Sequence, residues 1–119
     1  VILVGDFNSS PEDQPFESAF GLGTLIPPYL QAVGTGYHDL WLSKKKPRDG
    51  FTCCFSADVS DEDAQLYQRI DHIFFEPKAR EITKLKAKVL GDSNADMTDE
   101  NGLNPSDHAG VFGKIKLAK

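Results

Sequence analysis

Apolar residues fall in short runs along the chain, and these runs predict several β-strands. Residues 1–4 (VILV) form a continuous run rich in β-branched side chains, which is typical of a strand buried on both faces. Residues 51–55 and 68–75 predict two further strands, and the second of these becomes wholly apolar toward its end. Residues 80–90 alternate imperfectly with period two, and residues 109–118 predict a last strand.

One helix is predicted after the first strand. Ser9 and Ser10 offer a hydroxyl cap, Pro11 suits the first helical position, and acidic residues follow in the first turn. We expect this helix to continue to about Phe20, where glycines follow. Residues 22–36, which contain two adjacent prolines and further glycines, predict a loop with little regular structure.

Polar segments separate the later strands. Residues 43–50 predict a solvated basic turn, residues 56–65 an acidic loop, and residues 91–108 a long polar loop. Residues 92–103 begin like a calcium-binding EF-hand loop, but Met97 stands where that loop needs glycine, and its last position is not glutamate. We therefore interpret this stretch as an acidic loop beside a site.

The order of the predicted elements indicates an α/β or α+β protein with a mostly antiparallel sheet and one helical layer. A length of 119 residues suits a single domain. No apolar run approaches the ~18 residues that cross a bilayer. The formal net charge of -5 disfavours a broad, nonspecific grip on a nucleic-acid backbone, although a bound divalent cation can reverse the local sign.

Cys53 and Cys54 are the two cysteines of the chain, and they are adjacent. A disulfide between neighbours is strained, because ordinary bridges join Cα atoms about 4.4–6.8 Å apart. We therefore expect two strand residues that point to opposite faces, one of them in the core. A zinc site is not expected, because there is no Cys-x-x-Cys spacing and no histidine close to the pair in sequence.

Three polar clusters lie where predicted strands begin or end. Asp6 and Asn8 follow the opening strand and can face one cleft, although both residue types also favour turns and caps. Asp71 lies among apolar residues, where a buried carboxylate needs a partner from elsewhere in the fold; the alternative is an edge-strand aspartate facing solvent. Asp107 and His108 precede the last strand, and His108 is either a donor to a phosphate oxygen or a structural histidine.

Together these clusters resemble one known family. The stretches "GDFN" (5–8), "RIDHIF" (69–74) and "SDHAGV" (106–111) are similar, in order and spacing, to motifs of the C-terminal half of the endonuclease/exonuclease/phosphatase family. This superfamily includes DNase I, the abasic-site endonucleases, the neutral sphingomyelinases and the inositol polyphosphate 5-phosphatases. "GFTCC" (50–54) also resembles a strand found upstream of the Arg-Ile-Asp motif in many members.

The resemblance implies a metal-dependent phosphoesterase in which an activated water attacks a phosphate ester in line. Asp6 would orient and deprotonate the water, and Asn8 would donate its amide hydrogens to the phosphate. Asp71 would accept a hydrogen bond from His108 and fix its ring, and His108 would act on the phosphate. Asp107 and Asp6 would hold the cation, for which oxygen ligands suit Mg²⁺ or Mn²⁺.

The resemblance also implies that residues 1–119 are the C-terminal portion of one domain, a DNase I-like four-layer α/β sandwich, and contribute one sheet and one helical face. The N-terminal half of such a domain supplies an asparagine and a glutamate that bind the metal. We therefore expect the chain alone to expose apolar surface and to be poorly active or inactive.

The class of substrate is left open by the residues themselves. A lipid headgroup, a small phosphodiester and a nucleic acid all carry the required phosphate ester, and the net charge favours the first two. No obligate protein partner is evident. The alternative to an enzyme is a non-catalytic binding or scaffold module that retains the fold.

Overall fold

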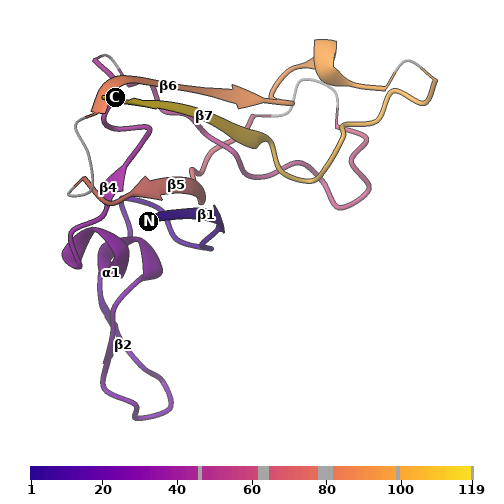
Figure 1. Ribbon diagram of the computed structural model, residues 1–119. Helices are drawn as coiled ribbons and strands as arrows, with labels where there is room; N and C mark the ends of the chain where they lie inside the picture. The colour runs from indigo at the N-terminus through magenta and orange to yellow at the C-terminus, as the bar shows by residue number, and fades with distance from the viewer. Residues whose placement is uncertain (46, 62–64, 78–81, 99, 119) are drawn as a thin grey trace.

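The computed structural model describes residues 1–45, 47–61, 65–77, 82–98 and 100–118 (Figure 1). Its elements are, in chain order, β1 (Ile2–Asp6), β2 (Phe16–Glu17), β3 (Thr24–Leu25), α1 (Pro28–Gly34), β4 (His38–Asp39), β5 (Asp71–Phe75), β6 (Ile82–Leu90), a 3-10 helix (Asn94–Asp96) and β7 (Gly110–Leu117). Every strand pair in the described part of the chain is antiparallel. The α+β class with mostly antiparallel sheet and one α-helix is therefore confirmed for these residues.

The central sheet has three strands in the order β1-β5-β4. The middle position of β5 agrees with its apolar composition. Its Phe74 and Phe75 are only 0% and 5% exposed. β1 lies at one edge, and its Ile2 and Val4 remain 58% and 67% exposed. The prediction that residues 1–4 are buried on both faces is therefore wrong within the described chain, because neither side chain is covered by a packed layer.

α1 covers one face of this sheet. Tyr29 and Ala32 of the helix pack against Phe74 of β5, and the partly buried Leu3 and Phe7 pack against this cluster. The helix begins at the second proline of the Pro-Pro pair, whose fixed φ suits a first helical turn. The prediction of an irregular loop over residues 22–36 is therefore wrong over Pro28–Gly34, and also over Thr24–Leu25, which forms β3.

The helix predicted to end near Phe20 is absent, and its residues form a turn followed by β2. Two hydrogen bonds join Ser10 and Asp13. The Ser10 N–H donates to Asp13 Oδ2 over 2.8 Å, and the Asp13 N–H donates to the Ser10 carbonyl over 3.2 Å. Pro15 would fall in the helix interior, where it has no N–H to donate and its ring meets the preceding turn. The capping signals therefore close a turn instead of starting a helix.

β6 and β7 pair along their length, and β7 packs against the other face of β5 (Figure 1). Gly113 of β7 allows this approach, because a Cβ there would lie 2.3 Å from Leu40 Cδ2 and 2.8 Å from Ile73 Cδ1. The strands predicted at 80–90 and 109–118 are confirmed over Ile82–Leu90 and Gly110–Leu117. Residues 80 and 81 lie outside the described residues.

The strand predicted at 51–55 is reduced to single bridges. Cys53 pairs in antiparallel fashion with Gln68 on one side and with His108 on the other. The segment therefore ties the chain that enters β5 to the chain that enters β7. No helix in the described part of the chain is long and apolar enough to cross a membrane.

Candidate functional site

Three titratable side chains meet at one end of the central sheet. Asp6 is the last residue of β1 and Asp71 is the first residue of β5, and the antiparallel register sets them opposite each other. His108 lies just before β7 and reaches the same place through the backbone bridge to Cys53. One ligand atom from each of the three side chains lies within 4.8 Å of the other two.

The best-defined contact of this cluster joins His108 and Asp71. Nδ1 of His108 lies 2.9 Å from Oδ2 of Asp71, and the two side chains are 24% and 20% exposed. Asp71 is thus half-buried, and its partner comes from a distant part of the chain. A carboxylate at Nδ1 fixes the tautomer and the orientation of the ring, and it directs the other nitrogen, Nε2, away from Asp71.

Asp6 also closes a turn with Asn8. The N–H of Asn8 donates to Oδ1 of Asp6 over 2.7 Å. Asn8 has a φ of 46°, a left-handed conformation that asparagine tolerates better than most residues. Both residues are exposed. Asp6 and Asn8 therefore form a turn, which is the alternative role that their residue types favour. Oδ2 of Asp6 lies outside the hydrogen bond that closes this turn.

Asp107 is the predicted site residue that does not join the cluster. It is exposed, and its Oδ1 accepts a hydrogen bond from the neighbouring Ser106 hydroxyl over 3.1 Å. Within the described chain, neither group of side chains able to hold a metal ion includes it. Of the two predicted metal ligands, Asp6 therefore lies in the cluster and Asp107 lies outside it.

The cluster offers two carboxylates and one imidazole, a donor set that can hold a divalent cation. Mg²⁺ and Mn²⁺ prefer carboxylate oxygens, whereas an imidazole also suits softer ions, so the donor set does not select one ion. Asp71 and His108 line an open depression whose rim includes Gly91, Asp96 and other residues of the long loop before β7. The acidic stretch expected beside a site thus contributes Asp96 to this rim.

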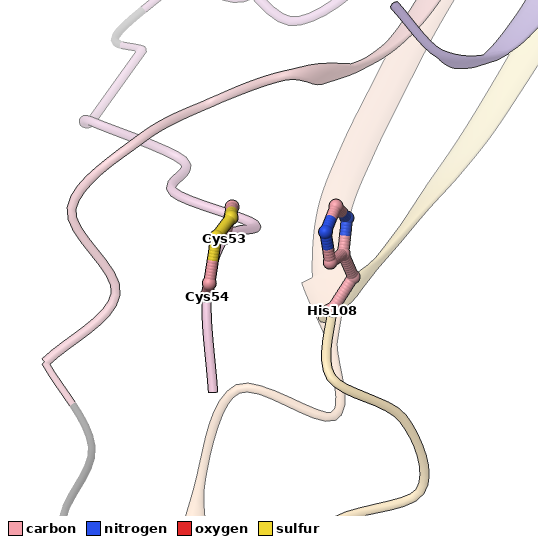
Figure 2. Close-up of side chains that lie close together, drawn as sticks. All are labelled: Cys53, Cys54 and His108. Carbon is pink, nitrogen blue, oxygen red and sulfur yellow. A yellow bond between two sulfur atoms is a disulfide. The ribbon is translucent and has the colours of Figure 1, made fainter. Parts of the chain in front are cut away.

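Cys53 and Cys54 lie next to His108 (Figure 2). The two sulfur atoms are joined in a disulfide, so the prediction of two strand residues facing opposite sides is wrong. That prediction assumed a regular strand, whereas only Cys53 takes part in bridges. Sequence analysis missed the nearby histidine, because the pairing of Cys53 with His108 joins segments that are far apart along the chain.

A second polar cluster is buried on the helix side of β5, and the sequence analysis did not identify it. Nη1 of Arg69 lies 2.8 Å from Oδ2 of Asp39 and 2.9 Å from Nδ1 of His72. The three residues are 4%, 6% and 2% exposed. The hydroxyl of Tyr29 donates to Asp39 over 3.0 Å. An arginine within an apolar stretch was the available signal, because a buried guanidinium requires an anionic partner.

The environment of this buried cluster shifts two pKa values. Burial lowers the pKa of His72 below its ordinary value of 6.5, because the imidazolium loses hydration. Burial, with the negative charge of Asp39, raises the pKa of Tyr29 to about 12. At neutral pH both rings are therefore uncharged, and the paired charges of the cluster are those of Arg69 and Asp39.

Comparison with models of protein families, with curated proteins and with solved structures found no match for this chain. The likeness to the endonuclease/exonuclease/phosphatase family therefore rests on the three sequence motifs alone.

Proposed function

We propose that this chain carries the C-terminal part of the active site of a divalent-metal-dependent phosphoesterase. The observation that supports the proposal most directly is the cluster of Asp6, Asp71 and His108 at one end of the sheet. In this cluster Asp71 holds the imidazole of His108. Asp6 supplies a second carboxylate, whose Oδ2 lies outside the hydrogen bond with the N–H of Asn8. Hydrolysis of a phosphate ester by water needs such a proton acceptor and such an oriented donor.

In the proposed reaction a water molecule is the nucleophile. Asp6 orients this water and accepts its proton, and the attack on phosphorus is in line with the bond that breaks. His108 is held by Asp71 through Nδ1, so its Nε2 can donate a hydrogen bond to a phosphate oxygen when it carries a proton. Asn8 follows Asp6 by two residues, and its side-chain amide is a further donor to the phosphate.

A divalent cation, Mg²⁺ or Mn²⁺, supplies charge stabilisation for the phosphate and the leaving oxygen when bound. The carboxylate of Asp6 is the ligand that the geometry favours. Asp107 is a second candidate through the resemblance, and its exposed carboxylate has to move to reach the cluster.

The proposal extends to the fold and to the substrate. The layers of helix, central sheet and second sheet are compatible with the C-terminal portion of a DNase I-like sandwich. The substrate is a phosphate ester, and the net charge of -5 favours a lipid headgroup or a small phosphodiester over duplex nucleic acid.

The test is the hydrolysis of bis-p-nitrophenyl phosphate with and without Mg²⁺ or Mn²⁺. It uses the product of the whole reading frame that encodes residues 1–119. Asp6→Asn and His108→Ala are each expected to lower turnover by about 10²-fold or more. The matched control is His38→Ala, which removes an exposed histidine of β4. Wild-type turnover in both site variants would refute the proposal.

A non-catalytic binding or scaffold module is the second candidate. The position of Asp107 outside the cluster favours it, because the predicted metal site then lacks one ligand. The same assay, extended to lipid and nucleic-acid phosphate esters, separates the two candidates: a folded full-length protein without metal-dependent turnover on any of these substrates supports the scaffold.

A further inference from the structure

A second group of ligand atoms meets the proposed site at His108. The sulfur atoms of Cys53 and Cys54 and a ring nitrogen of His108 lie within 4.8 Å of one another (Figure 2). In tetrahedral zinc sites, bonds of about 2.0–2.3 Å separate neighbouring ligand atoms by about 3.3–3.8 Å. The two sulfur atoms are bonded to each other in this structure, so they have to separate to this spacing before both can hold one ion with the ring nitrogen.

The backbone holds these residues in place. Cys53 forms a bridge with His108, and its carbonyl oxygen accepts the N–H groups of Tyr67 and Gln68 over 2.8 Å and 3.2 Å. Cys53 is 1% exposed, whereas Cys54 and His108 are half-buried. The group is thus built into the junction between two chain segments and is still accessible from one side.

We propose that the reduced chain binds one Zn²⁺ through the thiolates of Cys53 and Cys54 and the imidazole of His108. Two thiolates and one imidazole favour a thiophilic ion over Mg²⁺, which prefers oxygen ligands. Three protein ligands leave the fourth tetrahedral position to water. The site shares His108 with the cluster of Asp6 and Asp71, so His108 stands between a hard and a soft set of ligands.

Zinc binding at this site requires reduction of the disulfide. A dithiol reductant supplies two electrons and two protons: the bond between the two cysteine sulfurs breaks, two cysteine thiols form, and the reductant becomes a disulfide. When Zn²⁺ binds, each thiol releases its proton to solvent. The oxidised chain has no thiolate to offer.

Zinc at this site excludes the proposed role of His108. A bond through Nδ1 displaces the hydrogen bond to Asp71, and a bond through Nε2 occupies the nitrogen intended for the phosphate. Zn²⁺ therefore inhibits the reduced protein and leaves the oxidised protein active. This consequence rests on the proposed function, whereas zinc binding itself does not.

The test measures metal binding by residues 1–119 without any assay of activity. The chain is reduced with a dithiol, freed of it without air, and titrated with Co²⁺ as a spectroscopic substitute for Zn²⁺. We expect a sulfur-to-cobalt charge-transfer band, abolished by one equivalent of Zn²⁺. Cys54→Ser and His108→Gln should each weaken Zn²⁺ binding by about tenfold or more, and His38→Gln should bind like the wild type.

The oxidised wild-type chain is the control that needs no substitution, and it should give no charge-transfer band. A reduced chain without the band, or equal Zn²⁺ affinity in the oxidised and reduced chains, overturns the proposal. Zinc binding without inhibition of the full-length enzyme supports the zinc site and contradicts the role of His108. Hydrolysis that depends on His108 in a protein that binds no zinc supports the role of His108 and contradicts the zinc site.

Discussion

At the residue scale, His72 occupies a position that accepts only its neutral form. Its Nδ1 lies 2.9 Å from Nη1 of Arg69, a donor, and its Nε2 lies 2.8 Å from the carbonyl oxygen of Ser9, an acceptor. A neutral ring with its proton on Nε2 satisfies both neighbours. A second proton on Nδ1 would face an N–H of Arg69, in keeping with the lowered pKa.

This arrangement predicts a loss of stability in mild acid. The unfolded chain binds the extra proton of His72 at a higher pH than the folded chain, so protonation favours unfolding. The contribution is complete above the ordinary pKa of 6.5 and is lost as the pH falls toward the lower folded pKa. Urea unfolding measured from about pH 8 to about pH 5 tests this. His72→Gln should flatten the pH dependence and His38→Gln should not; an unchanged slope in His72→Gln contradicts the account.

At the same scale, a substitution of Gly50 tests its close contact with the ring of Trp41. It has a φ of +67°, and a Cβ there would lie 2.2 Å from Cε2 of Trp41. The indole is held by a hydrogen bond of 2.7 Å from its Nε1 to the carbonyl of Arg48. We expect Gly50→Ala to lower the free energy of unfolding by about 2–4 kcal/mol.

The matched control for this contact is Gly21→Ala. Gly21 has nearly the same backbone conformation, with a φ of +70°, and nothing lies within 4 Å of its added Cβ. Gly21→Ala should therefore lower the free energy of unfolding by only about 1 kcal/mol, because of the strain of the left-handed backbone. Equal losses for the two variants in urea unfolding would show that the contact with Trp41 is unimportant.

At the scale of elements, Thr52 links the segments that carry Asp71 and His108. Its side-chain oxygen accepts the N–H groups of Ile70 and Asp71, each over 3.3 Å, and its carbonyl accepts the N–H of Ala109 over 2.8 Å. The residue is 0% exposed. Its hydroxyl therefore sets the position of the chain where β5 begins.

Thr52→Val removes this acceptor at nearly constant volume. We expect it to lower the free energy of unfolding by about 1–3 kcal/mol, because buried N–H groups lose a partner. Thr52→Ser keeps the hydroxyl and should retain most of the stability. Chemical denaturation of both variants decides the matter, and a valine variant as stable as the serine variant would contradict this role.

The elements show which parts of the fold local sequence patterns can predict. β6 and β7 lie where alternation predicts strands, because their exposed lysines and half-buried apolar residues reflect one packed face. α1 was missed, although Pro28 is a suitable first helical residue. This helix has seven residues and is stabilised by the contacts of Tyr29 and Ala32 with Phe74, which no local pattern reveals.

The candidate site could also be predicted only in part from the sequence. Asp6, Asp71 and His108 were identified from motifs at strand ends, and the strand pairing brings them together. The neighbourhood of Cys53 and His108 was not foreseen, because it depends on a bridge between two segments without regular strand structure. Sequence spacing alone cannot report such a contact.

At the scale of the whole molecule, β5 separates two polar clusters. Side chains alternate along the strand, so Asp71 meets His108 on the side of β7, while His72 packs with Tyr29 and Phe74 on the side of α1. One cluster is open to solvent and is the proposed site of the chemistry. The other is buried and suited to fixing the strand that presents Asp71.

The proposed family predicts that residues 1–119 need further chain for activity. Ile2 and Val4 on the edge strand β1 are exposed, and the proposed metal site has one ligand in the cluster. We expect Mg²⁺-dependent hydrolysis of bis-p-nitrophenyl phosphate from the full reading frame and none from residues 1–119 alone. Turnover by the short chain, lost in His108→Ala, would show that its own residues complete the site.

The most direct test of the central claim is a double-mutant cycle on Asp71 and His108 in the full-length protein. The measured quantity is kcat/KM for a phosphodiester in the presence of Mg²⁺. If Asp71 acts by holding His108, Asp71→Asn and His108→Gln each lower kcat/KM by about 10²-fold or more, and the double variant is no worse than the poorer single variant. Losses that multiply, or single variants that retain wild-type kcat/KM, would contradict the account.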